Sequence, residues 1–183
     1  MPFLQSMPEN AGPPTIFKLY PAIYDHWGPM SEAMMNGPSS LSQGERELIL
    51  AYAAAVAGGS FVAAAHSEVA YAWGIADGAV DLLLENPATA PVDDKLKPLL
   101  ALVKKLAVTP AQVAQADIDA VLAAGWDEQA LHDAIAVTAR AAFMQRLAQG
   151  FGFTPMTKEA AAARAQQRKE LGYVNLYKTH SKL

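Results

Sequence analysis

The amino-acid sequence predicts an all-α fold, and three observations favour this class. Helix-capping residues, glycines and prolines recur at short spacing along the 183 residues. Between these breaks, apolar residues repeat three or four positions apart, which is the period of one helix face. Valine and isoleucine are scattered and form no run typical of a strand. We therefore expect a helical bundle, whose alanine-rich faces suit close packing within and between subunits.

Residues 1–40 are expected to form an N-terminal arm with short helices. Prolines at positions 2, 8, 13 and 14 remove backbone donors and block a helix over residues 1–14. Pro21 limits the next helix to short pieces. The pairs Gly28-Pro29 and Gly37-Pro38 then bracket another short helical segment.

A helical core is predicted over residues 41–155, and it starts with a clear cap. Ser42 and Glu45 have the spacing of a capping box, in which each side chain accepts a hydrogen bond from the other residue's backbone amide. This helix should end at Gly58-Gly59, and a second helix is expected over residues 60–73. The same signals predict further helices over residues 78–85, 93–106, 117–124 and 128–149.

The C-terminal part, residues 156–183, is expected to hold one more helix and a tail. Thr157 is a suitable N-cap for a helix over residues 158–171. Gly172 is a typical residue to end it. We expect residues 173–183 to be loosely held.

Composition excludes several classes of function. The chain has no cysteine, so it forms no disulfide, no thiolate metal site and no thiol nucleophile. The net charge of −4 argues against a nucleic-acid partner, because phosphate binding needs a dense basic face. The four histidines lack metal-ligand spacing, and no nucleotide-binding or other cofactor motif is present. We therefore expect neither a metal nor a cofactor.

Residues 48–65 carry no charge, and this run is as long as a minimal membrane span of ~18 residues. They consist mostly of alanine and glycine, and Gly58-Gly59 interrupts them, so a buried helix–turn–helix is favoured. No signal-peptide pattern precedes them. We expect a cytoplasmic protein. The terminal Ser181-Lys182-Leu183 matches a peroxisomal address, which would apply in a eukaryote, whereas the alanine-rich composition favours a bacterial source.

Glu47 and His66 flank this uncharged run, and positions 59, 62 and 66 share one face of the second helix. The arrangement resembles the signature of the AhpD-like alkylhydroperoxidases, within the wider carboxymuconolactone decarboxylase family. That signature is Glu, eleven residues, Cys-x-x-Cys, three residues, His. Here Gly59 and Val62 stand at the cysteine positions. The resemblance, to the peroxidase-related branch, covers most of residues 40–155, including segments 94–106, 109–110, 124–128 and 143–147.

The resemblance implies an AhpD-like helical homo-oligomer in which Glu47 and His66 relay a proton. Without the thiols, we expect cofactor-free proton transfer or decarboxylase-type chemistry on a small organic substrate, with Glu47 orienting His66. Phe61, Arg140 and Arg146 are candidate substrate-binding residues, although both arginines could equally be surface or salt-bridge residues. The alternative is a catalytically inactive oligomeric binding or scaffold protein of the same fold.

The protein should show no thiol-dependent peroxidase activity. In the family a thiolate attacks the peroxide oxygen, whereas glycine and valine have no sulfur, and no methionine stands at either position. The measurement is hydroperoxide consumption with a dithiol reductant, with a cysteine-containing AhpD-type enzyme as the positive control. Robust turnover that saturates with peroxide would contradict the prediction.

Overall fold

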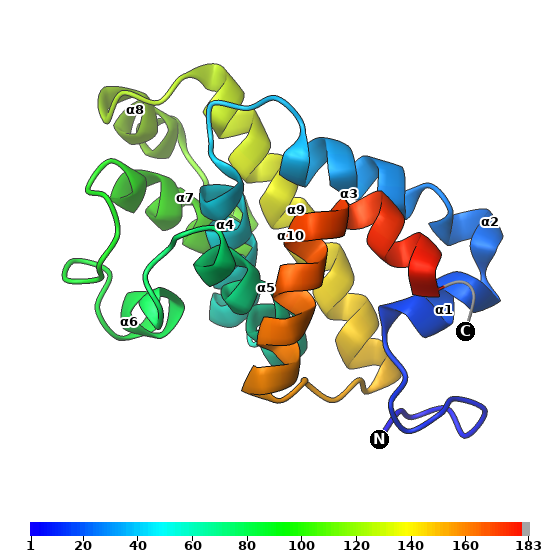
Figure 1. Ribbon diagram of the computed structural model, residues 1–183. Helices are drawn as coiled ribbons and strands as arrows, with labels where there is room; N and C mark the ends of the chain where they lie inside the picture. Colours follow the sequence, from blue (N-terminus) through cyan, green and yellow to red (C-terminus); the bar gives the residue numbers. More distant parts are fainter. Residues whose placement is uncertain (181–183) are drawn as a thin grey trace.

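The computed structural model describes residues 1–180, and within that range the chain forms helices and loops with no strand (Figure 1). The predicted all-α class is confirmed. The elements are α1 (Pro13–Leu19), α2 (Pro21–Tyr24), α3 (Trp27–Asn36), α4 (Gln43–Val56), α5 (Ser60–Ala72), α6 (Ala79–Glu85), α7 (Leu96–Val108), the 3-10 helix η1 (Pro110–Gln112), α8 (Gln115–Ala123), α9 (Glu128–Phe151) and α10 (Lys158–His180).

Helix α4 lies at the centre of the bundle. It packs against α5, α9, α7, α6 and α3, and its side chains from Arg46 to Ala54 are all buried. The predicted capping box starts it: Ser42 Oγ accepts from the Glu45 amide at 3.2 Å, and Glu45 Oε2 accepts from the Ser42 amide at 2.7 Å. This cap satisfies two of the amides that a helix start leaves unpaired. The site residue Glu47 therefore sits one turn into a rigid, buried helix.

Prolines lie in the first turns of several helices, where a missing backbone N–H costs little. Helix α1 begins at Pro13, so the irregular arm is two residues shorter than the expected segment 1–14. Helix α3 begins at Trp27 and runs through Gly28-Pro29, which we had expected to precede it. Pro98 likewise falls in the first turn of α7. The N-terminal segment is consequently more helical than its proline content suggests.

Helix α10 contradicts the expectation of a loose tail after Gly172. The backbone leaves helical geometry at Gly172 (φ 66°, ψ −172°) and then resumes a helix. The Glu32 carboxylate caps this restart, because its Oε2 accepts from the amides of Tyr173 at 2.5 Å and Val174 at 3.4 Å. Tyr173 and Leu176 are buried. The helix therefore crosses α5 and α3 as an integral layer of the bundle (Figure 1).

In the described part of the chain, no helix combines the length and the apolar character that crossing a membrane requires. The uncharged run 48–65 is divided between the end of α4 and the start of α5. The possible peroxisomal address, Ser181-Lys182-Leu183, lies outside the described residues.

Gly172→Ala should lower the free energy of unfolding by about 1–3 kcal/mol, because residues other than glycine are strained in this backbone region. The added Cβ would also stand 2.7 Å from Glu32 Oε2 and displace the cap. Urea denaturation measures the change.

Gly150→Ala is the matched control, since it lies inside α9 with nothing within 4 Å of its Cβ position. It should be neutral or stabilising by up to about 1 kcal/mol. Equal effects of the two substitutions would show that the Gly172 conformation is not required.

Candidate functional site

The two residues singled out from the sequence meet in the interior of the bundle. Glu47 comes from the first turns of α4 and His66 from the middle of α5, and these helices pack along each other. The His66 Nδ1 atom lies 2.6 Å from Glu47 Oε2, and both residues are buried, at 6% and 2% exposure. The structure therefore brings together the pair that the spacing predicts.

Tyr173 of α10 is a third member of this cluster. Its hydroxyl donates to Glu47 Oε1 at 2.5 Å, so both carboxylate oxygens accept a hydrogen bond. Its ring lies nearly parallel to the His66 imidazole, with centroids 6.5 Å apart and an interplanar angle of 9°. One buried carboxylate thus joins side chains from α4, α5 and α10.

The electrostatics of the cluster favour an ionised Glu47 and a neutral His66. Burial by itself would raise the pKa of Glu47, but the attraction and hydrogen bond of His66, helped by Arg168 and Tyr173, hold it below its ordinary value. Burial lowers the pKa of His66 to about 4, and the nearby Arg168 and Arg140 cations add to this against the opposing effect of Glu47. Burial beside Glu47 raises the pKa of Tyr173 well above 10, so its hydroxyl keeps its proton.

These charge states determine the tautomer of His66. An ionised carboxylate can only accept, so Nδ1 of the neutral ring carries the proton and donates it to Glu47. The lone pair is then on Nε2. Arg168 Nη1 is 3.4 Å from both ring nitrogens, which is too long for a strong hydrogen bond to either. Nε2 is therefore the atom able to accept a proton from a ligand.

His66 lines a pocket of about 820 Å³, a size suited to a small organic molecule. The lining includes apolar side chains from α5 and α9 and a wall from the N-terminal segment. The residues are Ser6, Pro8, Glu9, Asn10, Ala11, Gly12, Pro13, Pro14, Thr15, Lys18, Leu19, Phe61, Val62, Ala65, His66, Arg140, Met144, Thr154, Pro155, Met156, Arg164, Arg168 and Tyr177.

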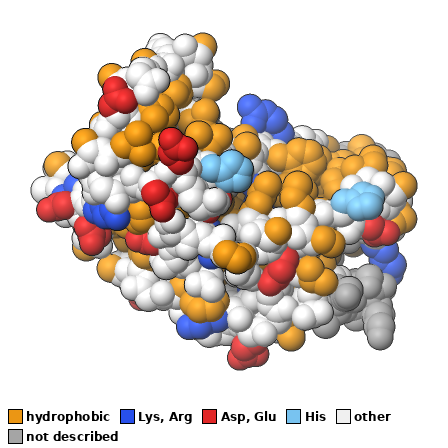
Figure 2. Space-filling model, turned by 90° about the horizontal axis from the view of Figure 1, so that it is seen from above, with side chains coloured by type: hydrophobic (Ala, Val, Ile, Leu, Met, Phe, Trp, Pro, Cys, Tyr) orange, Lys and Arg blue, Asp and Glu red, His pale blue; other side chains and the backbone are white. Residues whose placement is uncertain are grey.

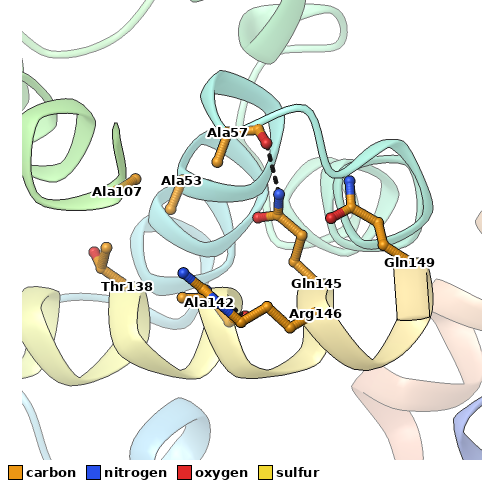
Figure 3. Close-up of a pocket in the computed structure, with 8 residues that line it drawn as sticks. All are labelled: Ala53, Ala57, Ala107, Thr138, Ala142, Gln145, Arg146 and Gln149. Atoms are coloured by element: carbon orange, nitrogen blue, oxygen red, sulfur yellow. Dashed lines mark hydrogen bonds between the residues drawn. The ribbon is translucent and has the colours of Figure 1, made fainter. Parts of the chain in front are cut away.

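The three predicted substrate-binding residues line two different pockets. Phe61 and Arg140 line the His66 pocket. Arg146 is exposed and lines a different pocket of about 260 Å³ between α4, α7 and α9, where its Nη1 donates to the Ala142 carbonyl at 2.9 Å (Figure 3). The structure does not bring Arg146 to Glu47 and His66.

The two cysteine-equivalent positions also differ. Val62 is buried and lines the pocket with His66, whereas Gly59 does not line it. A Cβ at Gly59 would stand 2.7 Å from Gln145 Cγ, and Gln145 Nε2 donates to the Ala57 carbonyl at 2.6 Å (Figure 3). Gln145 therefore fills the space that a side chain at position 59 would need.

Sequence reasoning missed Arg168 and Tyr173 of α10. The Gly172 stop signal obscured the tyrosine, and an arginine in the middle of an exposed-looking helix resembles a surface residue. A weak signal was present, because Tyr173, Leu176 and Tyr177 repeat at helical spacing beyond the glycine. The contact of these residues with the site depends on how α10 folds back, which has no local signature.

Among the described residues, no group of three or more His, Asp or Glu side chains is placed to hold a metal ion. Glu47 and His66 are occupied with each other and with Tyr173.

Comparison with solved structures identifies the architecture. The crystal structure of an AhpD-core, uncharacterized peroxidase-related protein from Ralstonia eutropha JMP134 superposes with a TM-score of 0.72, at 21% sequence identity over 78% of this chain and 75% of that one. The chain has the AhpD-like fold. An uncharacterized peroxidase-related protein from Silicibacter sp. TM1040 superposes with a TM-score of 0.66, at 19% identity over 84% of this chain and 91% of that one. The sequence matches no protein-family model and no curated protein.

The AhpD-like fold predicted from the motif spacing is thus confirmed. Cysteine is absent from the chain, so this example of the AhpD-like fold has no thiol to act as a peroxidase nucleophile. The outer residues of the motif, Glu47 and His66, are present and form a hydrogen bond in the interior.

Lowering the pH from 7 to 5 should destabilise the wild-type protein more than His66→Gln. The pKa of His66 is about 4 in the folded chain and 6.5 otherwise, so between these values the unfolded chain binds more protons. Stability is then lost as the pH falls through this window, by about 2 kcal/mol at pH 5. Urea denaturation at both pH values measures the difference.

His26→Gln is the control, since His26 is exposed and lies within 4.0 Å of no carboxylate of the described residues. It should keep the wild-type pH dependence. If His66→Gln kept it too, His66 would not be held neutral by burial.

Proposed function

We propose that this protein is a cofactor-free enzyme that transfers a proton to or from a carbon atom of a small organic substrate. The observation that carries the proposal is the buried 2.6 Å hydrogen bond between Glu47 and His66, at a pocket of about 820 Å³ that His66 lines. A carboxylate–imidazole pair at a mainly apolar cavity is an arrangement suited to general acid–base chemistry.

In this mechanism His66 is the proton acceptor and Glu47 is the positioning residue. Nε2 takes a proton from the substrate carbon, and the electron pair of that bond moves to the substrate's own carbonyl oxygen. The resulting imidazolium is stabilised by the Glu47 carboxylate, whose other oxygen is held by Tyr173. Return of the proton to the same or a neighbouring carbon completes the reaction and restores neutral His66.

The charge state of His66 favours proton abstraction over decarboxylation as the first step. Donating a proton to a carbanion left by carbon dioxide requires an imidazolium at the start. With a pKa of about 4, the protonated fraction of His66 at pH 7 is on the order of one in a thousand. Neutral His66 is ready to act as a base without prior protonation.

A second candidate function, an oligomeric binding or scaffold protein, is supported by an apolar surface. Large apolar side chains are exposed on α1, α2, α3 and α9 and between α1 and α2, and they include Leu19, Tyr20, Ile23, Met30 and Phe143. Figure 2, which views the molecule from above, shows apolar side chains gathered over α2 and α3. Such a surface suits an interface between copies of the chain, which sedimentation equilibrium would detect as a mass above that of the monomer.

Proton transfer is tested by deuterium incorporation into carbon acids in D₂O, followed by proton NMR. The probes are phenylacetone and phenylpyruvate, with carbon dioxide release from a 3-oxo acid followed in parallel. The wild-type protein should accelerate exchange, and His66→Gln should reduce the rate by about 10²–10⁴-fold, a common contribution of a general base. Glu47→Gln should also reduce the rate strongly, because an amide can donate to Nδ1 and leave the proton on Nε2, where it blocks the base.

His132→Gln is the control for a histidine outside the pocket and should exchange at the wild-type rate. Exchange no faster than in buffer would favour the scaffold function. Full activity in His66→Gln would contradict the proposed role of His66.

A further inference from the structure

Two buried arginines beside the Glu47–His66 pair form no ion pair with a carboxylate of the described residues. Arg140 of α9 and Arg168 of α10 are 3% and 8% exposed, and both line the His66 pocket. Within the described residues neither lies within 4.0 Å of a carboxylate. Arg140 Nη1 and Arg168 Nε also have no hydrogen-bond partner there.

The contacts that these arginines do make are weak. Arg140 Nε donates to Ser31 Oγ at 3.3 Å, and the two guanidinium carbons stand 4.8 Å and 5.0 Å from the centroid of the Tyr173 ring. A cation–π contact contributes about 0.5–2 kcal/mol, whereas burying an ion without a counter-charge costs several kcal/mol. Glu47 attracts Arg168 and so offsets one of the two cations, which leaves one positive charge for a ligand to offset.

The net charge of the buried cluster gives the charge of that ligand. Arg140 and Arg168 are cationic, Glu47 is ionised and His66 is neutral, so the cluster carries one excess positive charge. A singly charged anion would neutralise this excess charge, whereas a phosphate dianion would leave the cluster with a net negative charge.

The remaining lining residues beside His66 indicate that the body of the ligand is apolar. Phe61, Val62, Ala65 and Met144 present apolar surface beside His66. An apolar group gains free energy by leaving water for such a surface. Guanidinium forks also match the planar geometry of a carboxylate.

We propose that the pocket binds an organic monocarboxylate with an apolar body, and that Arg140 and Arg168 hold its carboxylate. This names the substrate class of the site and rests on the proposed function only for the role of His66. The carboxylate is retained during the reaction, because two guanidiniums stabilise its charge in the bound state and would slow its departure as carbon dioxide. His66 then exchanges a proton at a carbon near the carboxylate, and the two cations stabilise the negative charge that spreads onto the substrate oxygens.

The test uses 3-phenylpropanoate and its neutral analogue 3-phenylpropanamide, with isothermal titration calorimetry on the full chain. The acid should bind at least about tenfold more tightly than the amide, because only the acid completes the charge of the cluster. This comparison needs no variant, so it does not depend on how a substitution folds. Inorganic phosphate should not compete with the acid.

Arg140→Gln and Arg168→Gln should each weaken binding of the acid by at least about tenfold and leave the amide unchanged. Arg146→Gln is the matched control, because it lies on α9 like Arg140 but is exposed and lines the other pocket. It should bind the acid as the wild type does. Circular dichroism verifies the fold of each variant.

Equal affinity for acid and amide, no binding of the acid at millimolar concentration, or unchanged binding by both arginine variants would overturn the inference. Phosphate binding more tightly than the acid would overturn it in favour of a phosphorylated ligand. His66→Gln separates the two proposals, since it should bind the acid while losing exchange. Exchange that survives without selective acid binding would refute the ligand class alone, and acid binding without exchange would refute the proton transfer alone.

Discussion

The buried carboxylate of Glu47 is the constraint on which the rest of the site depends. A charge in the interior is tolerated only when its oxygens are hydrogen-bonded, and Glu47 achieves this with His66 on one oxygen and Tyr173 on the other. Because these partners come from α5 and α10, the requirement joins the consecutive helices α4 and α5 to α10, which is distant in sequence. The same bonds set the tautomer of His66 and direct its Nε2 lone pair away from the carboxylate.

The neighbouring packing shows how the AhpD-like fold accommodates the absence of thiols. Gln145 fills the space beside Gly59 and donates to the Ala57 carbonyl, so the first cysteine position is closed by a polar side chain. Val62 gives the second position an apolar surface inside the pocket. The cavity at His66 consequently presents an apolar surface and no thiol beside the hydrogen-bonded Glu47–His66 pair.

The electrostatics of Arg168 connect the proposed chemistry with the proposed ligand. Its guanidinium lies against His66, where its charge helps to lower the pKa of the imidazole, and it shares the Tyr173 ring with Arg140. The adjacent cations keep His66 neutral but also weaken it as a base, and the same cations attract an anionic substrate. The charge of a bound anion would offset theirs and raise the pKa of the imidazole, so ligand binding and proton transfer are coupled in this pocket.

The helical class, the capped start of α4, and the spacing of Glu47 and His66 around two positions without cysteine could be predicted from the sequence alone. These features are local: caps, breaks and motif spacing act over a few residues, so they can be read along the chain. Only the tertiary structure decided that Tyr173 and Arg168 complete the site, that Arg140 joins it, and that Arg146, six residues further along the same helix, does not. Gly172 is a typical residue to end a helix. A helix restarts after it because the Glu32 carboxylate of α3, which is distant in sequence, caps the new helix start, and α10 then packs over the pocket.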